Sequence, residues 1–168
     1  YREFTQADID IVGQGALAAH HDVEIPLVAL DVFEKLHTDL GLPPVSLHVN
    51  NRKLLEGFYR GLGIEDVTAV MQRVDKYDKI GPAAVTELLT RDLGVGQAQA
   101  DACVALAGIS ATDESFVDDV RRLGVDHELL DAGLEELASL MHVARASAGG
   151  RLVADLKIAR GLDYYTGT

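Results

Sequence analysis

The residues best suited to chemistry lie close together near the carboxyl end of the sequence, in Arg160-Gly-Leu-Asp-Tyr-Tyr165. Arg160 carries a permanently charged planar fork of donors that suits carboxylate or phosphate oxygens. Gly161 lets a bend or another group come close to the backbone, and Tyr164 and Tyr165 each offer a ring with a polar tip. By themselves these residues fit either an anion-binding site or an edge strand whose aromatic rings pack on a sheet.

A second set of candidate residues alternates along positions 4–11. The even-numbered positions carry aromatic or polar side chains, namely Phe4, Gln6, Asp8 and Asp10. The odd-numbered positions carry Thr5, Ala7, Ile9 and Ile11. Alternation with a period of two is typical of a β-strand. One face would pack on a core while the other displays a ring, an amide and two carboxylates. The pattern predicts which side chains share a face, but not what they bind.

The carboxyl-terminal motif resembles the histidine-specific signature of the histidyl-tRNA synthetases, a family of class II aminoacyl-tRNA synthetases. Three further stretches resemble the same family in the same order, namely residues 1–13, which are similar to the second half of motif 2, and residues 49–55 and 75–81. Four ordered matches are more specific than any one of them. Motif 1, the arginine that opens motif 2 and all of motif 3 lie outside these residues, so the resemblance implies an excerpt of a longer enzyme.

The resemblance implies that the intact enzyme activates histidine with ATP to histidyl-adenylate and then transfers it to tRNA(His). Phe4 would stack on the adenine of ATP. Arg160 would lie beside the α-phosphate and the carboxylate of histidine, where a fixed positive charge stabilises the negative charge that develops as pyrophosphate leaves. Mg²⁺ would accompany ATP, but no residue of this sequence is assigned to it.

The histidine-binding residues that the resemblance implies are Gln6, Asp10, Arg160, Tyr164 and Tyr165. Gln6 and Tyr164 would orient the amino acid, while Asp10 and Tyr165 would contact the imidazole. The family often has glutamate where Asp10 stands, so the side chain here is one methylene shorter.

The spacing of Arg160 and Tyr165 creates a problem of geometry. Residues five apart point to opposite faces of a regular strand, so both can contact one histidine only if the backbone between them is irregular. Gly161 is where a bulge costs least. We predict irregular backbone between Arg160 and Leu162, with Tyr164 facing away from Tyr165 unless it lines the pocket from the side.

Composition limits the remaining possibilities. The chain has 168 residues, of which 48% are hydrophobic, enough for one sizeable core. Its most apolar run, residues 25–30, is too short to span a membrane and contains Pro26. The single Cys103 excludes an internal disulfide framework and fits the reducing cytoplasm. A net charge of −12 opposes a broad basic face, so any contact with tRNA must be local or come from other segments.

The elements predict an α+β fold in which part of a class II antiparallel sheet, with a flanking helix, is interrupted by a mostly helical insertion. Residues 1–50 and 151–168 form the partial, discontinuous catalytic domain, and residues 51–150 form the insertion, which by resemblance contacts the tRNA acceptor arm. Beside the strand at 4–11, apolar periodicity predicts strands at 45–49 and from 152 onward. Between 50 and 147 it predicts helices only. The predicted helices are 22–40, 52–62, 65–77, 82–93, 97–106, 114–123 and 127–147.

Two pairs of residues invite a metal or cofactor interpretation. His20 and His21 are adjacent and so point in different directions, which is poor geometry for shared ligands. Met141 lies on an apolar helical stripe and is predicted to be core, with His142 at its boundary. We therefore predict no metal site.

Two other functions fit part of the sequence. The histidine-sensing regulatory subunit of ATP phosphoribosyltransferase resembles these synthetases but does not charge tRNA, and Arg160 together with residues 50–54 favours the synthetase. A helical interaction module without chemistry would have no use for the flanking strands. The resemblance also implies a homodimer in the intact enzyme, and it implies that these residues alone do not form adenylate.

Overall fold

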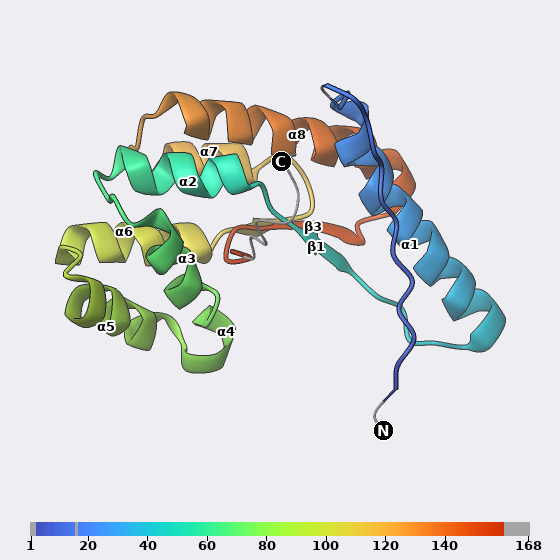
Figure 1. Ribbon diagram of the computed structural model, residues 1–168, viewed down its shortest axis with the longest axis horizontal. Coiled ribbons are helices and arrows are strands. Elements are labelled where there is room, and N and C mark those ends of the chain that lie inside the picture. Colours follow the sequence, from blue (N-terminus) through green and yellow to red (C-terminus); the bar gives the residue numbers. More distant parts are fainter. Residues whose placement is uncertain (1–2, 16, 160–168) are drawn as a thin grey trace.

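The computed structural model describes residues 3–15 and 17–159 of the chain. Within them, the helices and strands in chain order are α1 (His20–Leu40), β1 (Leu47–Val49), α2 (Arg52–Gly61), α3 (Val67–Val74), α4 (Tyr77–Ile80), α5 (Pro82–Leu93), α6 (Gln97–Ala107), β2 (Ser110–Ala111), α7 (Phe116–Arg121), α8 (Glu128–Ala148) and β3 (Leu152–Asp155). Figure 1 shows α2 to α7 gathered on one side, α1 on the other, and α8 running along the top of both groups, with the short strands between them. The described chain is therefore mostly helical with a small sheet.

Side chains at the ends of the helices explain several boundaries. Asn51 precedes α2 and its side-chain oxygen accepts hydrogen bonds from the backbone N–H groups of Lys53 and Leu54, which satisfies two donors that the first turn leaves unpaired. Pro82 opens α5, where its missing N–H and fixed φ are compatible with the helix. Gly41 ends α1 at a φ of 69°, a left-handed conformation that glycine adopts without strain. The sequence pattern thus places most helices correctly to within a few residues.

The small sheet has the strand order β1-β3-β2 and is mixed. β1 runs parallel to β3, with Leu47 opposite Leu152 and Val49 opposite Ala154, while β2 is antiparallel to β3. The expectation of an antiparallel sheet is therefore only partly correct for these residues. The expectation of helices alone between 50 and 147 is wrong at β2, because a two-residue strand is too short to produce an alternating pattern.

The core of the helical group is built on an unusually close contact between α2 and α8. Gly57 of α2 lies against α8, and a Cβ atom placed on it would be 2.1 Å from the backbone nitrogen of Leu130. Gly133 of α8 lies against α2 in the same way, with its virtual Cβ 2.2 Å from the backbone nitrogen of Leu54. The two glycines let the helix backbones approach until main chain meets main chain. The apolar stripe of α8 is buried along this contact and beyond it, at Leu130, Leu134, Leu137, Met141 and Ala144.

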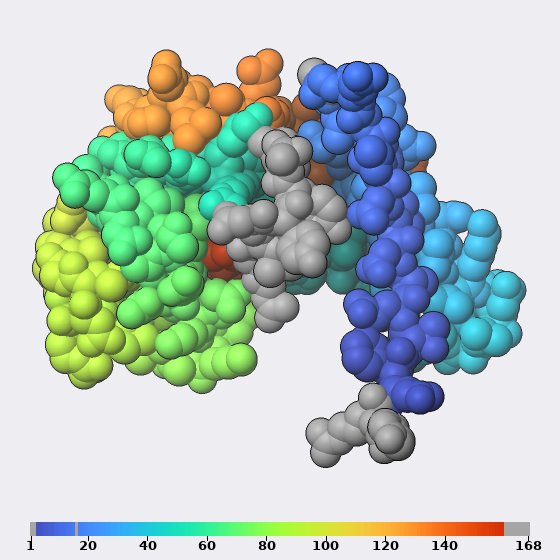
Figure 2. Space-filling model, in the orientation of Figure 1, coloured from blue at the N-terminus to red at the C-terminus, as the bar shows by residue number. Residues whose placement is uncertain are grey.

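The amino-terminal residues differ from the prediction. The segment 4–11 is not a strand, and Figure 2 shows residues 3–15 as an exposed stretch on the surface. A strand requires a neighbour that accepts its backbone hydrogen bonds, and the described residues supply none. Helix α1 begins at His20, two residues before the predicted Asp22, with Pro26 inside it. It packs on α8, and the side chains it leaves exposed include Val28, Val32 and Phe33.

Candidate active site

Of the predicted site residues, the structure describes three, all of them near the amino terminus. Phe4, Gln6 and Asp10 all lie on the irregular amino-terminal segment and are exposed, Phe4 to 83%. Arg160, Tyr164 and Tyr165 lie outside the described residues, as does the irregular backbone predicted after Arg160. The side chains of the 4–11 segment share no strand face here because the strand itself is not formed.

The structure does describe the chain that leads into Arg160, and it shows a turn there. Strand β3 ends at Asp155, and the backbone N–H of Ile158 donates to the carbonyl of Asp155 at 3.2 Å. The Asp155 side chain reinforces the turn, since its Oδ1 lies 3.5 Å from the backbone nitrogen of Lys157, the pattern in which an aspartate bonds the backbone two residues ahead. The N–H of Leu156 donates to the carbonyl of Ile109 at 3.1 Å. Strand β3 therefore ends five residues before Arg160.

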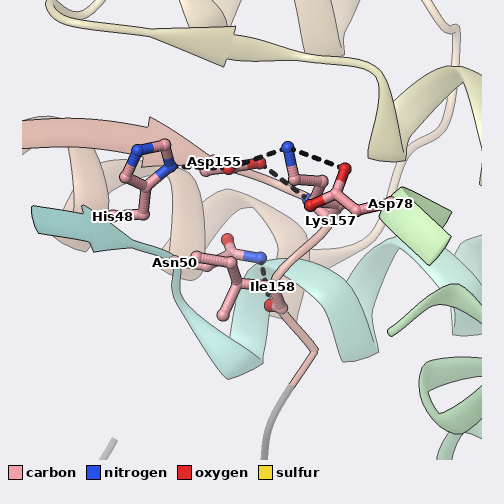
Figure 3. A network of polar contacts seen from close by, with 6 residues as sticks. All are labelled: His48, Asn50, Asp78, Asp155, Lys157 and Ile158. Atoms are coloured by element: carbon pink, nitrogen blue, oxygen red, sulfur yellow. Dashed lines mark hydrogen bonds and ion pairs between the residues drawn. The ribbon is translucent and has the colours of Figure 1, made fainter. Parts of the chain in front are cut away.

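Asp155 is a buried carboxylate that lies between two nitrogen-bearing side chains, the imidazole of His48 and the ammonium of Lys157 (Figure 3). It is 1% exposed, and its Oδ2 lies 2.7 Å from Nδ1 of His48 and 3.2 Å from Nζ of Lys157. Lys157 also reaches Oδ1 of Asp78 in α4, at 3.3 Å. Burial alone would lower the pKa of Lys157, but its hydrogen bonds to Asp155 and Asp78 outweigh this effect and raise the pKa above its ordinary value. The lysine therefore stays charged and compensates the buried carboxylate.

Asn50 and Asn51 connect the same turn to the helices. Asn50 donates from Nδ2 to the carbonyl of Ile158 at 2.8 Å, as Figure 3 shows. Asn51 donates from Nδ2 to Glu136 of α8 at 2.8 Å, and Lys53 forms an ion pair with the same carboxylate group at 2.6 Å. The pair of asparagines thus joins β1, the turn after β3, α2 and α8.

The family resemblance pointed to residues 49–55 but did not predict the contacts of Asn50 and Asn51. The sequence analysis also did not identify Asp155 and His48 as residues of this region. One signal was available for Asp155, because a carboxylate in the otherwise apolar stretch 152–156 must find a partner if the stretch is buried. The identity of that partner could not be read from the sequence, since His48 lies 107 residues away along the chain.

His20 and His21, one of the two pairs considered for a metal or cofactor, lie in the first turn of α1. The rings of His20 and His21 are 4.0 Å apart, and with Glu24 they form the one group, among the residues that the structure describes, whose ligand atoms lie within 4.8 Å of one another. The expectation that the two histidines point apart is therefore wrong. Nδ1 of His21 pairs with Glu24 at 3.1 Å, which is an ordinary arrangement for the exposed first turn of a helix.

Met141 is buried in the core, as predicted, and His142 lies at the surface with its Nδ1 2.7 Å from Glu114. The hydrogen bond from His142 lowers the pKa of Glu114 below its ordinary value. This pair is an exposed polar contact. An open groove between α1 and α8 is lined by His20, Leu27 and Val143 among others, and Phe4, Gln6 and Asp10, the predicted site residues that the structure describes, are not part of its lining. No helix in the described part of the chain is long and apolar enough to cross a membrane.

Comparison with known proteins defines first the class and then the family. The described fold matches part of the crystal structure of histidyl-tRNA synthetase from Nostoc sp. PCC 7120, with a TM-score of 0.78 and 27% identity, over 92% of this chain and 36% of that one. This likeness places the chain among the aminoacyl-tRNA synthetases. The sequence profile of the histidyl-tRNA synthetases matches residues 1–168. The chain belongs to the histidyl-tRNA synthetase family, and the resemblance inferred from its motifs is confirmed.

Two relatives show how much of such a protein the chain represents. It is 62% identical to the histidine–tRNA ligase of Cutibacterium acnes over 168 residues, all of this chain and 37% of that ligase. It is 51% identical to the histidine–tRNA ligase of Micrococcus luteus over 170 residues, covering 99% of this chain and 36% of that ligase. The chain therefore spans a little over a third of the length of the ligases it matches.

Proposed function

We propose that this chain forms part of the catalytic domain of a histidine–tRNA ligase, which activates histidine with ATP and transfers it to tRNA(His). The observation that carries the proposal is the 62% identity to the Cutibacterium acnes ligase along the whole chain. The match covers both the helical group and the segments that flank it, which favours a shared function over a shared core alone. Mg²⁺ bound with ATP, a homodimeric enzyme and a cytoplasmic location belong to the same proposal.

The roles of the individual residues follow from the motifs. Arg160 stabilises the charge on the α-phosphate during adenylate formation, which a guanidinium can do without gaining or losing a proton. Asp10 and Tyr165 bind the imidazole, and Gln6 and Tyr164 hold the rest of the amino acid. Phe4 stacks on the adenine.

The irregular amino-terminal segment fits this proposal if its partner strands lie elsewhere in the ligase. Residues 4–11 would then form a strand of the class II antiparallel sheet, with Phe4, Gln6 and Asp10 on its ligand face and the exposed side of α1 covered. The period-two alternation of the segment supports this. Amide hydrogen exchange tests it, because residues 4–11 should exchange more slowly within a complete ligase than in the isolated chain. Equal exchange in both would exclude the strand.

We also propose that residues 51–150 are a helical insertion that contacts the tRNA acceptor arm, and that 1–50 and 151–168 belong to the catalytic domain. The exposed glycines at 149 and 150, which follow α8, support a boundary there. Limited proteolysis should cut at this boundary and leave the helical unit intact. Cuts distributed evenly through the helices would contradict the division.

The experiment that tests the function uses a chimeric ligase, in which this chain replaces the matching stretch of the Cutibacterium acnes enzyme. Histidine-dependent exchange of labelled pyrophosphate into ATP and charging of tRNA(His) are measured beside the unmodified ligase. We expect both activities in the chimera. A folded chimera that shows neither activity would refute the proposal.

A further inference from the structure

The turn after β3 is held by side chains from distant parts of the chain. His48 of β1 contacts the buried carboxylate of Asp155, and Asn50, just after β1, donates to the carbonyl of Ile158. Lys157 connects the turn to Asp78 of α4 (Figure 3). Asp155 stands five residues before Arg160 in the sequence, so these contacts hold the last described stretch of chain before the motif.

Lys157 bridges two carboxylates that come from different elements. One is Asp155 at the end of β3 and the other is Asp78 of α4, which belongs to the helical group through its contact with α5. The ammonium lies 3.2 Å from the first and 3.3 Å from the second. The helical group and the sheet therefore share one charged contact at the turn.

The bridge affects the position of the backbone at the turn, because the buried carboxylate of Asp155 can replace its partners with water only if the side chain or the turn moves. Its side chain is 2% exposed, whereas that of Lys157 is 28% exposed. A charge so buried needs a partner or must become solvated. Without the ammonium, the carboxylate would draw water toward it or turn outward, and the backbone from 155 to 158 would shift with it. Catalytic groups tolerate displacements of only about 0.5 Å.

We propose that Asp155 and Lys157 are positioning residues for the histidine-activating motif, with the bridge from Asp78 through Lys157 to Asp155 linking the helical insertion to the formation of the adenylate. The inference rests on the proposed function, since it assigns these residues a task in that reaction. They do not touch the substrate. They act by fixing where the chain enters Arg160.

The test compares Lys157→Met with Lys53→Met in the chimeric ligase. Methionine keeps an apolar stem and removes the charge in both. Lys53 is the control, because its side chain is 34% exposed and its ion pair with Glu136 of α8, at 2.6 Å, does not include Asp155 or Asp78. We expect Lys157→Met to slow single-turnover adenylate formation at saturating histidine and ATP by about 10- to 100-fold, the cost of a displacement near 1 Å. The histidine Kd should change by less than about twofold, and Lys53→Met should leave the rate within about twofold of the parent.

Asp78→Asn provides a second, milder perturbation, because Asp78 is the exposed partner of the bridge. It should slow the same step by about two- to fivefold, as expected for an exposed ion pair. The double variant Asp78→Asn with Lys157→Met should be no slower than Lys157→Met alone, because both remove one bridge. If the Lys157→Met variant fails to fold, the rate of adenylate formation by the Asp78→Asn variant tests the positioning role instead.

The outcomes separate this inference from the proposed function. An active chimera in which Lys157→Met and Asp78→Asn form adenylate as fast as Lys53→Met overturns the positioning role and leaves the function intact. Additive losses in the double variant overturn the link through a single bridge. A folded but inactive chimera overturns the proposed function and the inference together.

Discussion

The contact between α2 and α8 yields a sharp test of the fold, the substitution Gly133→Ala. A Cβ at this position would lie 2.2 Å from the nitrogen, 2.6 Å from the Cα and 2.9 Å from the Cβ of Leu54. Contacts between such atoms are favourable at about 3.5–4.0 Å, so the two helices must separate by roughly 1 Å or more. Because the nearest atoms are backbone, no change of rotamer relieves the overlap.

The magnitude follows from two opposing effects. Alanine is favoured over glycine inside a helix by about 1 kcal/mol, while overpacking a core costs typically about 1–3 kcal/mol and occasionally more. Rigid backbone at the contact places the cost at or above the upper end, so the net loss in the free energy of unfolding should be about 2 kcal/mol or more. For a chain of this size, that corresponds to a fall in Tm of roughly 4–8 °C.

Thermal and urea unfolding of the chain, followed by far-UV circular dichroism, measures this loss. Gly61→Ala is the matched control within α2. Its virtual Cβ lies 2.5 Å from a side-chain methyl of Val125 and 3.2 Å from the carbonyl oxygen of Asp126, so its worst overlap is with a side chain and not with backbone. We expect the control to lose less than about 1 kcal/mol. A Gly133→Ala protein as stable as the wild type, or more stable, would refute the close packing of α2 on α8.

Three further predictions concern the site and the core. Asp10→Asn in the chimeric ligase should weaken histidine binding by about 1.5–3 kcal/mol, the range for a hydrogen bond to a charged group, and leave ATP binding nearly unchanged; equal losses for both ligands in titration calorimetry would make Asp10 a support of the strand. Burial raises the pKa of Cys103 to about 12, so its thiol keeps its proton and should react with iodoacetamide at about pH 8 at least 100-fold more slowly in the folded chain than in urea; similar rates would show that the thiol is accessible. The isolated chain should not form adenylate, because it spans only 37% of the length of the ligase to which it is 62% identical; histidine-dependent pyrophosphate exchange above a no-enzyme control would contradict this.

The sequence predicts the helical part of this fold well, and α8 shows why. Its apolar stripe is long and regular, and the predicted span 127–147 differs from the observed Glu128–Ala148 by one residue at each end. Glycines that adopt positive φ, such as Gly41 and Gly124, also fall at the predicted helix ends. Both signals are local, since a few neighbouring residues determine them.

Features that depend on distant partners could not be predicted in the same way. The alternation at 4–11 indicates a strand, but forming one requires a neighbour that the described residues do not provide. The parallel pairing of β1 with β3 joins residues about a hundred positions apart, such as Leu47 and Leu152. The contact between His48 and Asp155 depends on this pairing, because it places β1 beside β3. The candidate ligand-binding residues come from the family resemblance alone, whereas the residues that hold the chain before Arg160 became visible only in three dimensions.

The central claim is that this chain carries the arginine that promotes the formation of histidyl-adenylate. The most direct test is single-turnover adenylate formation by the chimeric ligase at saturating histidine and ATP, with Arg160 and with Arg160→Lys. Lysine keeps the charge but loses the planar fork, so we predict a rate lower by up to about 10²–10³, the effect of removing one preorganised stabiliser, with little change in the histidine Kd. A near-normal rate with only the histidine Kd raised would contradict the claim and make Arg160 a binding residue.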